Sequence, residues 1–188
     1  MSTQQKYEPG HASGAEVKKN GEQWTLVLTR DLAHPPAKVW AALTDPAQLR
    51  EWAPFDADRN LGTTGPATLT TVGAPQAPAS ATVRRAEAPK VLEYDWGGQD
   101  VRWELAPIAK GGTRLTLWHN IDRRFISMGA AGWHICLDVL ARALDGAPLG
   151  RIVGGDALKF GGWQRLNAEY AAQFGVEAPS WPPAGGQG

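Results

Sequence analysis

The sequence has little of what marks a secreted or membrane-spanning protein. Its 188 residues include one cysteine, Cys136, so an internal disulfide and a multi-cysteine metal site are excluded. No stretch approaches the roughly 18 consecutive apolar residues of a membrane span. The opening residues, MSTQQKYEPG, lack the apolar core of a signal peptide. These absences predict a cytoplasmic protein without a membrane span.

Neither sign of charge is in excess. Lys plus Arg number 19 and Asp plus Glu number 19, which gives a formal net charge of zero. Contact with nucleic acid phosphates requires a net basic face, so we expect no nucleic acid partner. Hydrophobic residues make up 43% of the chain, which predicts a packed core.

The motifs of several enzyme classes are also missing from the sequence. It contains no Gly-x-Ser-x-Gly nucleophile elbow and no His-Glu-x-x-His zinc motif, and no Gly-Lys-Ser/Thr follows Gly154-Gly155. We therefore expect no catalytic residues of these kinds, no metal site and no cofactor. The sequence leaves open whether the protein is an enzyme and favours the answer that it is not.

Tryptophan, in contrast, is abundant, with nine residues. Indole rings either fill a core between a sheet and a helix or wall a cavity, because ligand pockets are mostly apolar and aromatic. Composition alone leaves both interpretations open.

Short strands are predicted over most of the chain. Residues 17–24 are typical of a hairpin with Asn20-Gly21 as a type I′ turn, and residues 24–32 alternate as a strand. Because short turns connect consecutive strands, the sheet should be antiparallel. The further strands are expected over residues 66–72, 80–87, 91–96, 100–106 and 113–121, with one possible strand before residue 62.

Two short helices are expected after the first long strand. Pro36 suits the first position of one helix, and Asp45-Pro46 supplies an N-cap and a first position for the next.

The last third of the chain changes to a helical period. Apolar residues from 133 to 144 share one arc of a helix. A Gly-rich break over 146–155 then precedes a second helix, capped by Asp156 and ended by Gly175.

Several side chains in these elements have two interpretations. His134 and Asp138 lie four residues apart on the polar side of their helix, which favours a surface salt bridge over a catalytic dyad. His119 shares a strand face with apolar residues, so it is either a satisfied buried histidine or a polar contact to a ligand. Asn167 has the same ambiguity, and Cys136 is expected to be inert packing.

Residues 29–46 (TRDLAHPPAKVWAALTDP), followed by Leu49 and Trp52, resemble the opening of the SRPBCC (START-like) superfamily. The branch they resemble holds bacterial proteins similar to the C-terminal domain of the activator of the ninety-kilodalton heat-shock protein's ATPase. The resemblance covers residues 23–174. Later segments match in the same order: Leu92 with Trp96, residues 112–117, Gly132-Trp133, Leu137-Asp138 and Leu140.

The resemblance implies an α+β helix-grip fold, in which a curved antiparallel sheet wraps around a C-terminal helix and leaves an internal cavity. It also implies two short helices after the first strand and hydrophobic ligands. The chain departs from the family at residues 61–65, where two adjacent glycines are usual, and at the 146–155 break. We expect a disordered arm over 1–14, one domain over 15–175 and a flexible tail over 176–188.

The expected function is binding of an apolar small molecule or lipid-like ligand, as a carrier or sensor, by a monomer or a homodimer. One alternative is a polyketide cyclase or aromatase-like enzyme, which would need a polar pair such as His119 with Asn167 inside the cavity. The other is a chaperone or regulatory interaction module, which an exposed apolar patch would favour. The expected cavity walls are Trp52, Trp96, Trp103, His119, Trp133, Leu137, Trp163 and Asn167.

Overall fold

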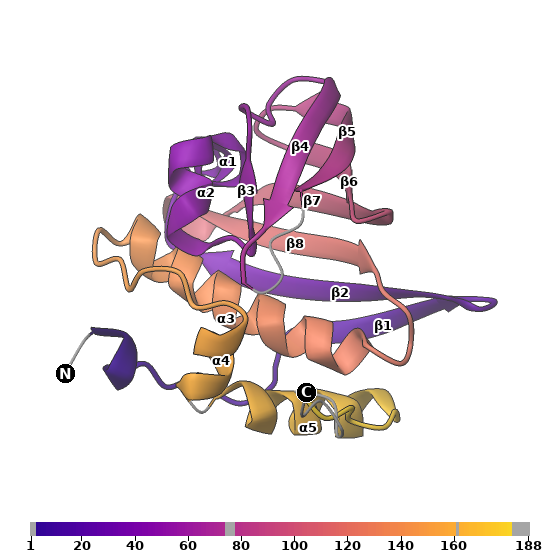
Figure 1. Cartoon of the computed structure of the whole chain (residues 1–188). Helices are drawn as coiled ribbons and strands as arrows, with labels where there is room; N and C mark the ends of the chain where they lie inside the picture. Colours follow the sequence, from indigo (N-terminus) through magenta and orange to yellow (C-terminus); the bar gives the residue numbers. More distant parts are fainter. Residues whose placement is uncertain (1–2, 74–77, 161, 182–188) are drawn as a thin grey trace.

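A computed structural model describes residues 3–73, 78–160 and 162–181. Its strands form one antiparallel sheet in the order β1-β2-β8-β7-β6-β5-β4-β3. The sheet curls around α3, as Figure 1 shows, so the predicted helix-grip fold is confirmed. The strands are β1 (Ala15–Asn20), β2 (Gln23–Leu32), β3 (Phe55–Ala57), β4 (Gly65–Thr71), β5 (Pro78–Glu87), β6 (Val91–Trp96), β7 (Gln99–Ile108) and β8 (Gly112–Asn120).

The helices lie at one end of the sheet and across its concave face (Figure 1). None of those within the described ranges is long and apolar enough to cross a membrane. They are the 3-10 turns η1 (Thr3–Lys6) and η2 (Ala109–Gly111) and the α-helices α1 (Pro36–Thr44), α2 (Pro46–Trp52), α3 (Ile126–Leu144), α4 (Gly155–Lys159) and α5 (Trp163–Phe174).

The central strands pair as their alternation predicts. Leu28 of β2 lies opposite Leu117 of β8, and Trp103 of β7 lies opposite Leu117 on the other side. Val101 lies opposite His119 in the same ladder. Because side chains alternate across a strand, these residues share the inner face of the sheet, and all five are buried.

The β1–β2 hairpin differs from its prediction in the turn. Asn20 pairs with Gln23, so Gly21 and Glu22 are the two loop residues. Only Gly21 has a positive φ, 62°. A type I′ turn requires positive φ at both central residues, whereas glycine at the first position fits type II′. The predicted type I′ turn at Asn20-Gly21 is therefore wrong in two respects: the loop begins one residue later, and its glycine fits type II′.

The two short helices begin at the predicted signals. The Asp45 carboxylate accepts a hydrogen bond from the Ala47 amide at 3.0 Å, and Pro46 is the first residue of α2. The Trp52 indole then donates to the Ala42 carbonyl at 3.0 Å, which fixes α2 against α1.

The polar side of α3 is not a surface, which corrects the prediction for His134 and Asp138. His134 is only 3% exposed, and its Nδ1 lies 2.7 Å from the Tyr170 hydroxyl and 2.9 Å from the Arg30 guanidinium. Its Nε2 lies 3.5 Å from the Asp138 carboxylate, which also accepts a hydrogen bond from Tyr7 at 2.6 Å. Because α5 covers α3 on the side away from the sheet (Figure 1), both sides of this helix are buried.

The last helical region is divided in two, where one helix starting at Asp156 was predicted. Gly154 is the N-cap of α4, and Asp156 lies inside that helix. A separate helix, α5, then begins at Trp163, and its N-cap is Gly162. Glycine lowers helix propensity, and a Cβ at Gly162 would overlap the Pro9 ring. Gly175 ends α5 with φ of 68°, as predicted.

Residues 3–14, where a disordered arm was predicted, run along α5 and α3. The Glu169 carboxylate accepts a hydrogen bond from the Ala12 amide at 2.9 Å, and Arg165 donates to the Pro9 carbonyl at 2.6 Å. Residues 182–188 of the predicted tail lie outside the described residues.

Candidate functional site

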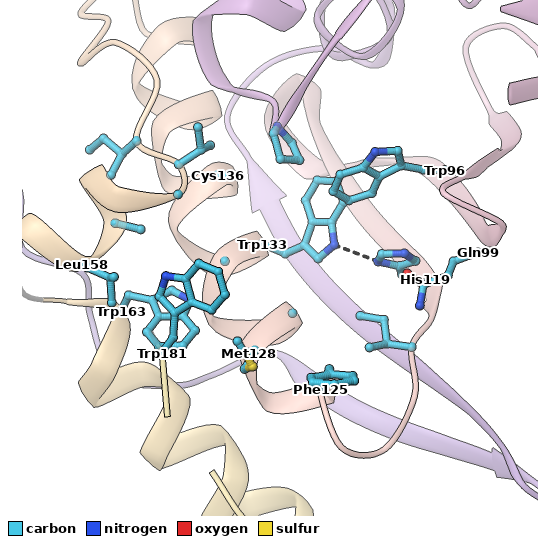
Figure 2. A pocket seen from close by; sticks show the side chains of 18 residues that line it. Trp96, Gln99, His119, Phe125, Met128, Trp133, Cys136, Leu158, Trp163 and Trp181 are labelled. Carbon is cyan, nitrogen blue, oxygen red and sulfur yellow. Dashed lines mark hydrogen bonds between the residues drawn. The ribbon is translucent and has the colours of Figure 1, made fainter. Parts of the chain in front are cut away.

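A cavity of about 480 Å³ lies beside α3. The ends of β6, β7 and β8 form one wall and α3 forms the second (Figure 2). The third wall consists of Ile152, Val153, Gly154, Ala157, Leu158 and Trp163. Nearly all of its lining side chains are apolar or aromatic.

The wall formed by α3 contains two glycines. The residues that line the cavity are Met128, Gly129, Gly132, Trp133 and Cys136, whose spacing places them on one helical face. A Cβ at Gly132 would meet no atom within 4 Å, whereas a Cβ at Gly129 would lie 2.5 Å from Ile121 Cδ1. The cavity therefore exists partly because α3 has no side chain at position 132.

The sheet wall is an aromatic cluster. Trp96, at the end of β6, stacks on His119 of β8 with ring centroids 5.8 Å apart and meets Trp133 edge-on at 5.9 Å. The Trp96 indole donates to the Thr71 hydroxyl at 3.2 Å. The hydrogen-bonding capacity of Trp96 is thus used within the protein, which leaves its ring face for apolar contact.

His119 is the ionisable side chain with the most defined geometry in this wall. Trp133 Nε1 donates to His119 Nδ1 at 3.0 Å (dashed in Figure 2). An indole nitrogen only donates, so Nδ1 has no proton and the neutral ring carries its proton on Nε2. Burial lowers the pKa of His119 to about 4, so the ring is neutral at pH 7.

The rim of the cavity is formed by exposed aromatic side chains. Phe125, just before α3, is 50% exposed and Trp181 is 41% exposed. Both line the cavity, and they are the exposed large hydrophobic side chains within the described ranges. Exposed apolar surface therefore continues from the outside of the protein into the cavity wall at both side chains.

The structure brings four of the eight predicted wall residues together: Trp96, His119, Trp133 and Trp163 all line the cavity. Trp52, Trp103 and Leu137 are buried but do not line it. Trp103 packs edge-on behind Trp133, with ring centroids 5.5 Å apart.

Asn167 lies in a different hydrogen-bond network from His119. Its side-chain oxygen accepts from the Ser127 hydroxyl at 2.7 Å, and its amide nitrogen donates to the Pro179 carbonyl at 2.9 Å. The His119–Asn167 pair that a cyclase-like reaction would need is therefore not assembled.

Cys136 lines the cavity as a buried thiol. Burial raises its pKa to about 12, so the nucleophilic thiolate is scarce at pH 7. Within the described ranges, no three His, Cys, Asp or Glu side chains are grouped so that they could hold a metal ion.

Several lining residues were not predicted from the sequence. Gly129 and Gly132 had a readable signal, because glycine inside an apolar helical pattern often has a packing or functional reason. Gln99, Phe125, Met128 and Trp181 had none, since their place depends on how β7, α3 and the C-terminal segment meet.

Residues 33–145 match the model of a family described as activator of Hsp90 ATPase homolog 1-like protein. No curated protein matches the chain.

Solved structures share the fold at low sequence identity. The conserved protein of unknown function EF2215 from Enterococcus faecalis is 18% identical over 87% of this chain and 92% of its own, with a TM-score of 0.66. CalU16 from Micromonospora echinospora is 22% identical over 88% of this chain and 98% of its own, with a TM-score of 0.60. Protein MLL2253 from Mesorhizobium loti is 24% identical over 65% of this chain and 97% of its own, with a TM-score of 0.57.

Proposed function

The chain belongs to the family of activator of Hsp90 ATPase homolog 1-like proteins, and from this premise we propose that it binds an apolar small molecule or lipid-like ligand in the cavity beside α3. The observation that carries the proposal is the cavity itself. Its volume of about 480 Å³ falls within the roughly 300–1,000 Å³ of small-molecule pockets. Its walls combine many apolar groups with few polar ones, the usual composition of such pockets.

The exposed rim supports binding of a small molecule over docking of a protein partner. An interaction module would present an apolar patch away from the cavity. Phe125 and Trp181, the exposed large apolar side chains of the described residues, instead line the cavity. We propose a carrier or sensor, located in the cytoplasm, that takes its ligand in past these two side chains.

The test is to fill the cavity from α3 without disturbing the protein. Gly132→Leu adds a side chain where a Cβ meets no atom within 4 Å. N-phenyl-1-naphthylamine, a neutral fluorescent probe, should bind the wild type at one saturable site and quench tryptophan emission. Gly132→Leu should weaken that binding by about 10-fold or more, because the loss of a few apolar contacts amounts to about 1–3 kcal/mol.

The matched control is Gly10→Leu. A Cβ at Gly10 also meets no atom within 4 Å, but Gly10 does not line the cavity. This variant should bind the probe as the wild type does. Unchanged affinity in a folded Gly132→Leu protein would show that the probe binds elsewhere. Absence of saturable binding to the wild type would reject the proposal and favour the interaction module.

A further inference from the structure

One buried polar atom of the cavity wall has no hydrogen-bond partner among the described residues. His119 Nε2 is buried and forms no hydrogen bond with any described residue. Other buried nitrogens share this property, on Arg102, Trp118 and Arg151, but none of those residues lines the cavity. Buried polar groups are nearly always hydrogen-bonded, so an unpaired one points to a missing partner.

The partner missing at His119 must be a hydrogen-bond acceptor. Trp133 donates to Nδ1, which leaves the proton on Nε2. The stacked ring of Trp96 and the bonded indole of Trp133 hold the imidazole in one orientation. Neither neighbour can accept from Nε2, because an indole nitrogen only donates.

Gln99 is the other polar side chain beside this atom. It begins β7 two residues before Val101, which pairs with His119, so both side chains lie on the inner face of the sheet. Figure 2 shows the end of the Gln99 side chain next to the His119 ring, and both line the cavity. Gln99 is half-buried, and Figure 2 marks no hydrogen bond between its amide and the other residues drawn.

We propose that the ligand of this cavity is an apolar molecule with one uncharged acceptor oxygen, such as a carbonyl or an ether, that accepts a hydrogen bond from His119 Nε2. This inference rests on the proposed function, because it names the ligand class of the same cavity. Nε2 is closed off from solvent. Because the Gln99 side chain lies beside it, we expect the oxygen to reach Nε2 when that side chain is displaced. The displaced amide then has a ligand oxygen within its own reach.

The same geometry excludes charged ligand groups at this end of the cavity. Of the described residues that line the cavity, none is Lys, Arg, Asp or Glu, and His119 itself is neutral at pH 7. A carboxylate or an ammonium group would therefore be buried without a counter-ion, which is strongly unfavourable.

Two probes of nearly the same shape test the acceptor directly. 2-Acetylnaphthalene carries a carbonyl where 2-isopropenylnaphthalene carries a methylene group. Water solvates the ketone better than the alkene, which lowers the affinity of every variant for the ketone. The preference for the ketone is therefore measured as the Kd of the alkene divided by the Kd of the ketone. This ratio is then compared between the wild type and each variant. We expect His119→Phe to reduce the preference for the ketone by about 10-fold, the size of one net hydrogen bond. The anion 2-naphthoate should bind the wild type about 10-fold more weakly than the ketone or worse.

Gln99→Leu is the matched variant on the neighbouring strand. It removes the second polar side chain and leaves the imidazole in place, so the ketone preference should persist. Persistence in His119→Phe together with loss in Gln99→Leu would identify the Gln99 amide as the donor to the ligand oxygen and overturn the proposal. An equal preference in all three proteins would also overturn it.

A measurement on the wild type covers the case in which His119→Phe does not fold. In protein labelled with ¹⁵N-histidine, the ketone should shift the Nε2 and Hε2 resonances of His119 downfield and the alkene should not. Equal shifts from both probes would contradict the acceptor role while leaving apolar binding intact. If neither probe binds, the proposed function itself fails.

Discussion

Two aromatic clusters lie on the inner side of this sheet, and they differ in what faces them. In the packed cluster, Trp52, Phe55, Tyr94 and Trp103 are completely buried, and Trp103 donates to the Tyr94 hydroxyl at 3.0 Å. In the cavity cluster, Trp96, His119, Trp133 and Trp163 face open space. Aromatic content is therefore similar in the two clusters and does not by itself make a pocket.

The helix that forms the second wall of the cavity, α3, explains the difference between the two clusters. The cavity face of α3 carries Gly129 and Gly132, which contribute no side chains. Further along, Val139 and Leu140 are completely buried in the core. The same helix thus closes the interior with branched side chains in its second half and leaves it open with glycines in its first.

The largest expected effect is on the free energy of unfolding, which a substitution in the packed cluster should lower far more than one at the cavity rim. Trp103→Ala should lower the free energy of unfolding by about 3–5 kcal/mol, the cost of removing a fully buried large side chain. Phe125→Ala, at the half-exposed rim, should change it by no more than about 0.5 kcal/mol while weakening probe binding. Urea titrations measure both. A larger loss of stability in Phe125→Ala than in Trp103→Ala would break the comparison.

The second effect depends on pH and belongs to the cavity cluster. Burial holds the pKa of His119 at about 4, below its unfolded value of 6.5. The unfolded chain therefore binds the proton more readily, and the stability present above pH 6.5 is lost as the pH falls toward 4. For His119 this loss amounts to about 3 kcal/mol.

Urea titrations between pH 7.5 and 4.5 check this pH dependence. His119→Gln, which has no ionisable group, should have a shallower slope of stability against pH than the wild type. Tyr94→Phe in the packed cluster should keep the wild-type slope, because burial raises the pKa of Tyr94 far above this range. Parallel slopes for the wild type and His119→Gln would refute the assignment.

The third effect concerns His134, a buried residue whose two ring nitrogens, unlike those of His119, both contact polar partners. His134→Ala should cost about 2–3 kcal/mol, because it opens space beneath α5 and removes a partner of Tyr170. The loss should be nearly independent of salt, in contrast to a surface ion pair. Thermal melts at two salt concentrations decide this. A salt-sensitive loss below about 1 kcal/mol would restore the surface pair expected from the sequence.

The smallest effect tests whether the space at Gly132 is open. Gly132→Ala should raise the free energy of unfolding by up to about 1 kcal/mol, because alanine is the better helix former. Gly129→Ala should instead be destabilising, since its Cβ would lie 2.5 Å from Ile121 Cδ1. If both variants respond alike in urea titrations, the two glycines do not have different surroundings.

Local patterns predicted the antiparallel sheet and the two short helices, whereas the helix-grip arrangement was implied by the family resemblance. Alternation in residues 24–32 predicted β2, the apolar neighbours of His119 indicated the inner face of β8, and Asp45-Pro46 placed the start of α2. These signals concern neighbouring residues in the chain, so they can be read without tertiary structure.

The candidate site could be predicted only in part, for a physical reason. Trp96 and Trp103 were both expected in the cavity wall, but the alternation of side chains along a strand does not indicate what an inward side chain will contact. Trp103 meets Trp133 and Tyr94, whereas Trp96 borders the cavity. The burial of His134 was missed for the same reason, because helical periodicity does not reveal that α5 covers the second face of α3.

The most direct test of the contrast between the clusters uses the methyl group of Met128. The chain has two methionines, Met1 and Met128, and Met128 lines the cavity. In protein labelled with ¹³C at the methionine methyl groups, 2-acetylnaphthalene should shift the Met128 resonance saturably, with the Kd obtained from tryptophan quenching. The Trp103 indole N–H resonance, from the packed cluster, should stay in place. A Trp103 signal that moves while Met128 stays unchanged would contradict the account.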